Sequence, residues 1–278
     1  MPTIRTDLAA EAHALWQKSA AETTELPGVA ARDGALLGLP LTQVDILDEE
    51  GSRALGKPQG RYLTLTLREK ELREPEGLKT AALALRELLC PMLPKEGTIL
   101  VAGLGNPRLA VDALGPLTVE GLLVTRHLRD VLPELRPVAG LSGGVLGDTG
   151  LEAGEWIYGA AKAAGAAAVI LVDALAAGSL QRLGTTVQLS DVGLVPGSGV
   201  GNHRMALDRD TLGVPVLSLG VPTVVDVSSL SQELPAGYFV TAQDMDRTIL
   251  RLGKLLGLGL TLALQPELTL EEAEALLA

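Results

Sequence analysis

Two aspartates stand where apolar segments of this sequence end, and their side chains are suited to acid–base chemistry. Asp112 follows the turn after the apolar run 98–104, and Asp173 directly ends the run AAVILVD at 167–173. If both runs are strands of one parallel sheet, their carboxyl ends meet in the crevice where such sheets bind ligands. Two carboxyl groups that lie close together share a proton at neutral pH, because two full charges repel each other. The pair can then activate a water molecule, with one group as acid and the other as base.

Each aspartate also has a simpler interpretation, as the N-cap of a helix. An aspartate just before a helix accepts hydrogen bonds from backbone N–H groups and favours the positive end of the helix dipole. The residues alone leave both interpretations open for Asp112 and Asp173.

The turn before Asp112 is rich in glycine, with Gly103 and Gly105 followed by Asn106. It matches a dinucleotide-binding turn only weakly, because the third glycine before the helix is missing. We expect these three residues to shape the turn and to offer N–H donors to an oxyanion.

A second glycine-rich segment, GLVPGSGVGN at 193–202, is too irregular for a helix or strand. It is expected to be a surface loop of functional size that clamps or covers a substrate. Gly199, Asn202 and the adjacent His203 are its candidate binding residues. The other histidines, His13 and His127, lie far away in the sequence and form no chelating motif. We therefore predict no metal site and no cofactor.

Composition restricts the kinds of partner and compartment. The 278 residues include 23 Lys and Arg against 34 Asp and Glu, and the net charge of −11 argues against binding to a nucleic acid backbone. The single cysteine, Cys90, rules out a disulfide within the chain and fits a reducing cytoplasm. Residues 1–12 lack the apolar core of a secretion signal, and prolines and glycines interrupt the uncharged stretch within 211–225. No membrane span is expected.

Strand-like and helix-like segments alternate along most of the chain, which predicts an α/β fold. We expect a mixed, mostly parallel sheet flanked by helices on both faces, within a single domain over 1–278. The expected strands are 44–47, 62–67, 98–104, 137–141, 167–172, 185–189 and 215–219. The expected helices are 7–21, 77–90, 112–128 and 151–164, and a last long helix has its apolar stripe at Met245, Ile249, Leu252, Leu256, Gly259 and Ala263. Residues 51–60 are expected to form a hairpin turn.

Long runs of the sequence resemble the germination proteases of endospore-forming bacteria. They are IRTDLAAEA (4–12), GLGNPRLAVDALGPLTVEGLLVTRHL (103–128), VILVDALAAGSLQRLGTTVQLSDVGLVPGSGVGN (169–202) and LGVPVLSLGVPTVVD (212–226). The resemblance covers nearly the whole chain in order. It implies a fold similar to that of the hydrogenase maturation proteases.

The resemblance also implies an activity. Family members are unusual aspartic-type endopeptidases, made as zymogens, that degrade small acid-soluble spore proteins at germination and form tetramers. Their proposed catalytic aspartates fall on Asp112 and Asp173. The expected compartment is the cytoplasm of the forespore, later the spore core.

The family cuts at sites similar to Thr-Glu-(Phe or Ile)-Ala-Ser-Glu, after the first acid. The segment Thr6-Asp7-Leu8-Ala9-Ala10-Glu11 has the same order of residue types. The resemblance therefore predicts self-cleavage between Asp7 and Leu8, with 1–7 as a short prosegment. Alternatively, Thr6 and Asp7 simply cap the first helix.

Two other functions remain open at this point. A metal-dependent maturation protease would use the same acids together with a third ligand, for which only His203 or Asp191 is a plausible donor. A non-catalytic relative would keep the fold as a binding module.

Overall fold

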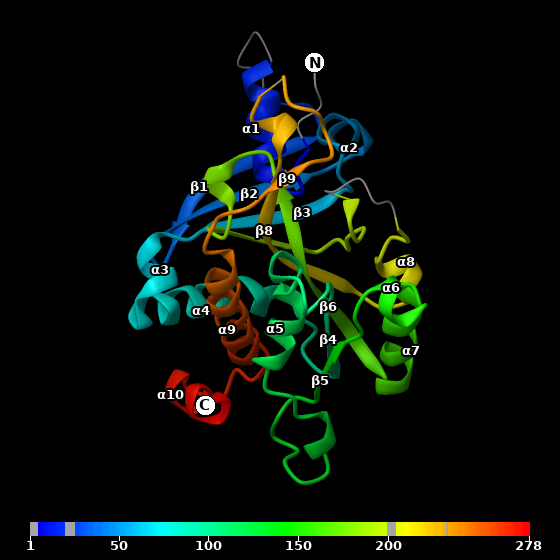
Figure 1. The fold of residues 1–278 in the computed structure, drawn as a ribbon. Helices are drawn as coiled ribbons and strands as arrows, with labels where there is room; N and C mark the ends of the chain where they lie inside the picture. Colours follow the sequence, from blue (N-terminus) through cyan, green and yellow to red (C-terminus); the bar gives the residue numbers. More distant parts are fainter. Residues whose placement is uncertain (1–4, 20–25, 199–203, 232) are drawn as a thin grey trace.

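The computed structural model describes residues 5–19, 26–198, 204–231 and 233–278. Its centre is a nine-stranded sheet in the order β1-β2-β3-β7-β8-β6-β4-β5, with β9 paired to β8 (Figure 1). The strands are β1 Val29–Leu36, β2 Leu39–Ile46, β3 Gly60–Thr66, β4 Thr98–Gly103, β5 Val138–Ser142, β6 Ala166–Ala177, β7 Thr186–Ser190, β8 Val216–Asp226 and β9 Phe239–Val240.

The sheet is mixed, as expected, but it is not mostly parallel, because β1, β2, β3, β7 and β9 join it through antiparallel pairs. Parallel pairing joins β5 to β4, β4 to β6 and β6 to β8. The pairs β7–β8, β3–β7, β2–β3, β1–β2 and β8–β9 are antiparallel. Parallel pairing is thus confined to β5, β4, β6 and β8. Asp173 lies on β6, and Asp112 comes after the turn that follows β4.

Helices cover both faces of the sheet, as expected, with α4, α5 and α9 on one face and α7 on the other (Figure 1). β6 shows why: Ile170 and Val172 point into the first core, while Val169 and Leu171 point into the second. The helices are α1 Ala9–Ser19, α2 Glu49–Leu55, α3 Glu69–Arg73, α4 Pro75–Leu89, α5 Leu114–Glu120, α6 Leu146–Thr149, α7 Ala153–Ala164, α8 Arg209–Leu212, α9 Met245–Leu264 and α10 Leu270–Leu277. The stripe expected on the last long helix is buried on α9.

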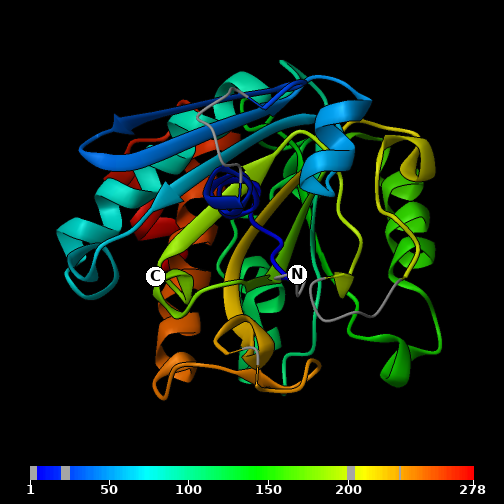
Figure 2. The ribbon, with the colours of Figure 1, turned by 90° about the horizontal axis from the view of Figure 1, so that it is seen from above.

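The first helix packs on the antiparallel strands, and Figure 2 shows it end-on beside them. Ala9 and Ala10 of α1 lie in one apolar cluster with Val44 of β2 and Tyr62 of β3. Because α1 is held by this cluster, the residues just before it are held at the edge of the parallel strands.

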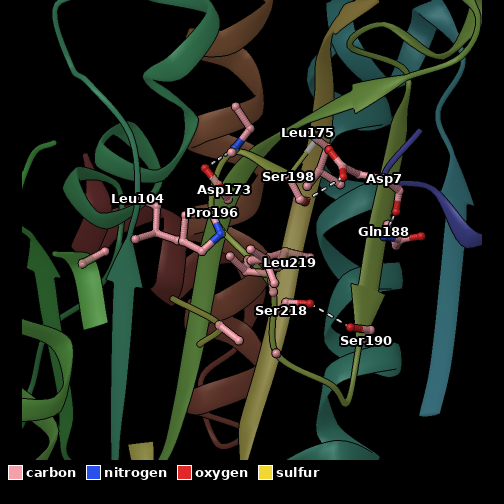
Figure 3. Close-up of a pocket in the computed structure, with 18 of the residues that line it drawn as sticks. Asp7, Leu104, Asp173, Leu175, Gln188, Ser190, Pro196, Ser198, Ser218 and Leu219 are labelled. Atoms are coloured by element: carbon pink, nitrogen blue, oxygen red, sulfur yellow. Dashed lines mark hydrogen bonds between the residues drawn. The ribbon is translucent and has the colours of Figure 1, made fainter. Parts of the chain in front are cut away.

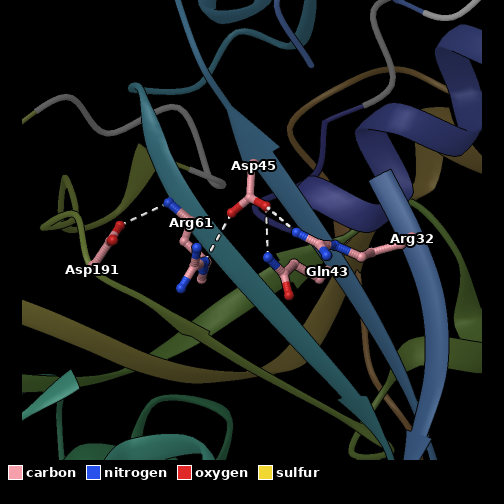
Figure 4. Close-up of polar contacts among 5 residues, drawn as sticks. All are labelled: Arg32, Gln43, Asp45, Arg61 and Asp191. Atoms are coloured by element: carbon pink, nitrogen blue, oxygen red, sulfur yellow. Dashed lines mark hydrogen bonds and ion pairs between the residues drawn. The ribbon is translucent and has the colours of Figure 1, made fainter. Parts of the chain in front are cut away.

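Asp45 links the antiparallel strands through a polar cluster (Figure 4). Its carboxylate accepts hydrogen bonds from Arg61 at 2.9 Å and Gln43 at 2.6 Å, and it pairs with Arg32 at 3.4 Å. Burial opposes the charged form of Asp45, but these bonds outweigh it and lower its pKa. The backbone N–H of Arg61 also donates to Asp191 at 2.7 Å, which ties β3 to the loop after β7.

Three local expectations need correction. Residues 51–60 are not only a turn, because α2 forms there between an Asp48 N-cap and a left-handed Gly56. The helix expected over 112–128 ends at Glu120, where the backbone of Gly121 packs so closely on α9 that a Cβ on Gly257 would lie 2.3 Å from its carbonyl oxygen. β6 runs on through Asp173 to Ala177 and does not end at Val172.

The α9 helix is long and apolar, but neither it nor any other helix in the described ranges meets the length and hydropathy needed to cross a membrane.

Candidate active site

A cleft of about 810 Å³ lies beside the parallel strands and is lined by both Asp112 and Asp173. Figure 3 shows Asp173 in this cleft. Its walls include the Gly105 turn, part of the glycine-rich loop at 193–198, and the segment 204–210. Asp7, from the other end of the chain, also lines it. The fold therefore joins, in one cavity, two residues that lie far apart in the sequence and the expected self-cleavage site.

Asp173 occupies the middle of β6, paired in register with Gly220 of β8. Its side chain is only 8% exposed, and its Oδ1 accepts the Ala174 N–H at 2.9 Å. No helix begins at this point, so the N-cap interpretation of Asp173 is wrong. A carboxyl group on a central strand is held as firmly as the core around it.

Asp112 ends a short 3-10 turn, Ala110–Asp112, which precedes α5. Its Oδ2 accepts the Asn106 N–H at 2.8 Å, while the preceding Val111 carbonyl accepts the Thr223 hydroxyl of β8 at 2.7 Å. The residue in the N-cap position of α5 is Ala113, which has no capping side chain. The N-cap interpretation is therefore wrong for Asp112 as well.

The glycine turn is built around Asp112. Gly105 has φ of 109°, and a Cβ there would lie 1.9 Å from the Asp112 carbonyl oxygen. Gly103 packs against α5, where a Cβ would lie 2.3 Å from the Gly115 carbonyl oxygen. The expected role of Asn106 as an oxyanion donor needs correction, because its N–H is already bonded to Asp112. The turn thus orients a carboxyl group.

The two acids differ in their electrostatic environment. Burial, and then the charge of Asp112, raises the pKa of Asp173 well above its usual value, and Asp7 adds to this rise. Burial also raises the pKa of Asp112, but the Asn106 N–H favours its ionised form. The positive charge of Arg204, a residue not anticipated from the sequence, opposes the rise in pKa of both acids without cancelling it. Asp173 therefore keeps a proton to higher pH, and Asp112 is the stronger candidate for a base.

The N-terminal segment lies in this cleft. The Asp7 N–H donates to the Ala176 carbonyl at 2.9 Å, and the Asp7 carboxylate accepts the Ala176 N–H at 2.8 Å. The Ser198 hydroxyl donates to the same carboxylate at 3.2 Å (Figure 3). The interpretation of Asp7 as a helix cap is wrong, since its carboxylate binds β6 and the loop. Thr6 accepts the Leu8 N–H just before α1, at 3.1 Å.

The residue after Asp7 fills an apolar pocket. Leu8 is fully buried with Ala177 of β6 and Val225 of β8. Further along, the Glu11 carboxylate accepts the Gly178 N–H at 2.7 Å. Separate groups on β6, on β8 and in the loop that follows β6 therefore contact the large apolar residue and the second acid of the predicted cleavage sequence, while the acid before the bond lies in the cleft.

Lys57 is a further cleft residue that the sequence did not single out. Its ammonium donates to the Thr6 carbonyl at 3.2 Å. Burial lowers the pKa of Lys57, while the charges of Asp7 and Glu11 raise it. Lys57 thus places a positive charge where the N-terminal segment presents its acids.

The remaining candidates are placed as follows. Gly199, Asn202 and His203 lie outside the described residues. Asp191 lines the cleft, but its carboxylate accepts the Arg61 N–H. Among the residues that the structure describes, no group of three or more His, Cys, Asp or Glu side chains is arranged to hold a metal ion.

Fold and cleft together define an α/β protein with paired carboxyl groups in a cleft that holds a stretch of polypeptide. The germination protease family model matches residues 8–240, and the chain belongs to that family. This confirms the resemblance seen in the sequence runs.

Three relatives, each called germination protease, illustrate the similarity. The protein of Bacillus cereus is 43% identical over 241 residues, which are 83% of this chain and 65% of that protein. The protein of Caldanaerobacter subterraneus is 38% identical over 324 aligned positions, covering 99% of this chain and 98% of that protein. The protein of Clostridium perfringens is 41% identical over 243 residues, covering 84% and 74%. The chain therefore spans about two thirds of the Bacillus relative and nearly all of the Caldanaerobacter one.

Among solved structures, the [NiFe] hydrogenase maturation protease HycI from Thermococcus kodakarensis is similar at a TM-score of 0.39 and 20% identity. The match covers 62% of this chain and 98% of that chain. At this score we draw no argument from the likeness.

Proposed function

We propose that this chain is an aspartic-type endopeptidase in which Asp112 and Asp173 activate water, and that it cuts its own Asp7–Leu8 bond. One observation carries the proposal: the segment with the expected cleavage sequence lies in the same cleft as the two acids, close enough that the Asp7 charge raises the pKa of Asp173. Membership of the germination protease family supports the same activity.

The stronger rise in the pKa of Asp173, compared with that of Asp112, supports different roles for the two acids. Asp112, as carboxylate, takes a proton from water while the water oxygen forms a bond to the peptide carbonyl carbon. Asp173 gives its proton to the carbonyl oxygen, so no full negative charge develops there. When the tetrahedral intermediate collapses, Asp112 gives its proton to the amide nitrogen and the C–N bond breaks, so the amine leaves neutral. A hydroxyl of the intermediate returns a proton to Asp173, so the new carboxyl group forms and both acids regain their starting states.

The contacts of the N-terminal segment support a substrate class. An acid before the cut bond is bound by the Ala176 N–H, the Ser198 hydroxyl and the charge of Lys57, and the residue after it enters the pocket of Leu8. Sites of the form Thr-Glu-(Phe or Ile)-Ala-Ser-Glu fit these contacts. We therefore propose small acid-soluble spore proteins as substrates, degraded in the spore interior during germination.

We further propose that the protein acts as a homo-tetramer of single-domain subunits and that residues 1–7 are a short prosegment. Light scattering at several protein concentrations measures the oligomeric state. A particle mass equal to one chain at all concentrations would contradict the tetramer.

The central test follows the intact mass of the purified chain over time at mildly acidic pH. Self-cleavage removes the mass of residues 1–7 from the wild type, while the Asp112→Asn and Asp173→Asn variants keep their full mass. Asp33→Asn is the matched control, since Asp33 is an exposed aspartate on β1. Equal cleavage in all four proteins would refute the acid pair.

A second assay uses the peptide Thr-Glu-Ile-Ala-Ser-Glu in trans. Hydrolysis after the first Glu by the wild type, and not by the two Asn variants, is the expected result. Binding of the peptide by the wild type without any hydrolysis would favour a non-catalytic relative.

A further inference from the structure

Gln188 is a buried polar residue in the middle of β7, and its side chain faces the cleft. It is 8% exposed and lies on β7 between Val187 and Leu189, which point into the opposite core. The sheet register places it in one row with the acid site, because Gln188 pairs with Gly220 and Gly220 pairs with Asp173. Residues paired in register point to the same face of a sheet, so Gln188 and Asp173 share the cleft side.

The Gln188 side chain binds the main chain on both sides of the Asp7–Leu8 bond. Its Nε2 donates to the Asp7 carbonyl at 3.0 Å, and Figure 3 shows the two residues side by side. Its Oε1 accepts the Ala9 N–H at 2.8 Å. The Asp7 carbonyl belongs to the peptide bond that the proposed self-cleavage breaks. One side chain therefore contacts the bond to be attacked and the peptide N–H two residues later.

An amide suits this double contact better than other side chains. It carries a donor and an acceptor in one rigid plane, whereas a carboxylate has no donor and an ammonium has no acceptor. Because both partners are main-chain groups, the contact does not depend on which side chain follows. The identity of the acid and of the apolar residue is left to other parts of the cleft.

We propose that Gln188 is the substrate-binding residue that aligns the scissile peptide and donates a hydrogen bond to its carbonyl oxygen. This inference rests on the proposed function. As the carbonyl oxygen gains charge during attack, a donor already in place stabilises the transition state. Gln188 would thus supply the hydrogen-bond donor to the oxyanion that was expected from the sequence at Asn106. The Asn106 N–H instead donates to Asp112.

A paired change of enzyme and substrate tests this contact. Two peptides are made from residues 3–14: one natural, and one with an ester in place of the amide between the residues equivalent to Leu8 and Ala9. The ester keeps every side chain and removes the Ala9 N–H that donates to Gln188; its Leu8 carbonyl is a weaker acceptor, but this change is the same for every enzyme variant. Both are given to the full-length wild type, to Gln188→Ala and to Gln43→Ala, a matched control on β2 outside the cleft. Cleavage after the aspartate is followed by mass, and kcat/KM is measured.

We expect the ester to slow the wild type about tenfold, the effect of losing one hydrogen bond. Gln188→Ala should cut the natural peptide about 100-fold more slowly, as for other lost oxyanion donors, and should distinguish the two peptides by less than about twofold. Gln43→Ala should behave as the wild type. Competition from the protein's own N-terminus cancels, because both peptides meet the same enzyme.

The outcomes separate this proposal from the proposed function. If the wild type cuts both peptides equally, or if Gln188→Ala keeps full activity, the role of Gln188 is refuted while the peptidase stands. If the wild type cuts neither peptide, the proposed function is refuted, and the role of Gln188 with it. Should Gln188→Ala unfold, Gln188→Met keeps the side-chain length and gives the same comparison.

Discussion

Replacing Asp173 by Asn should stabilise the protein while abolishing its activity. Asp173 is buried on β6, and burial together with the Asp112 charge raises its pKa well above the usual value. Asn has the same shape and keeps an oxygen for the Ala174 N–H. The substitution therefore removes a titrating group and leaves the packing unchanged.

The sign follows from proton linkage. A carboxyl group whose native pKa is raised binds its proton more tightly in the folded state, so stability is complete at acid pH and falls as pH rises. Between the ordinary aspartate pKa of about 3.9 and the raised native value, the free energy of unfolding falls by about 1.4 kcal/mol per pH unit. Asp173→Asn lacks this loss. For a chain of this size, the difference corresponds to about 2–4 °C in Tm per pH unit.

Thermal unfolding of both proteins at several pH values from about 4 upward, where an aspartate of the unfolded chain begins to ionise, measures this effect. The Tm of Asp173→Asn should exceed that of the wild type by a margin that grows with pH. Asp33→Asn removes one charge from the same chain, whose net charge is −11, and should show a small, pH-independent change. A constant or reversed difference for Asp173→Asn would refute the raised pKa.

Three further predictions concern other parts of the structure. Gly105→Ala should lower the free energy of unfolding by about 1–3 kcal/mol and slow peptide cleavage, because Gly105 has φ of 109°. Gly34→Ala is the control, since no atom lies within 4 Å of a Cβ placed there. It should change neither the unfolding measured by fluorimetry nor the rate of peptide cleavage. Asp45→Asn should lower the free energy of unfolding, measured with urea at neutral pH, by about 1 kcal/mol. The difference should vanish as pH falls through the lowered native pKa of Asp45, because the wild type then loses the same charge. A pH-independent difference would contradict this prediction. Leu8→Ala should cost about 2–3 kcal/mol in the same assay and slow self-cleavage, since Leu8 is fully buried; unchanged values for both would refute the apolar pocket.

The parts of the fold that apolar runs define could be predicted from the sequence. The runs at 98–104 and 167–172 become β4 and β6, and the stripe from Met245 to Ala263 becomes the buried side of α9. β1 was missed because most of its residues, such as Arg32 and Asp33, are exposed and show no alternation. α2 was missed because Gly51 suggested a turn, although Asp48 and Gly56 are readable helix-end signals.

Only those site residues could be predicted whose side-chain type and position in the sequence already indicate a function. Asp112 and Asp173 stand out as acids after apolar runs, but their shared cleft depends on the pairing of β4 with β6. Gln188 alternates with Val187 and Leu189 as a polar residue does in many strands, and its role becomes interpretable only when Asp7 lies against it. Lys57 and Arg204 had no signal, because a surface cation and a cleft cation look alike in a sequence.

The sheet order also sets the time at which the site can exist. Asp173 lies on β6, which pairs with β4 on one side and with β8 on the other, and β8 extends to Asp226. Most of the chain must therefore leave the ribosome before β6 has both neighbours. Asp7 emerges before the strands that bind it, because its partners on β6 and β7 lie more than 160 residues further along the chain. A nascent chain therefore carries its cleavage sequence long before it has a cleft to hold it.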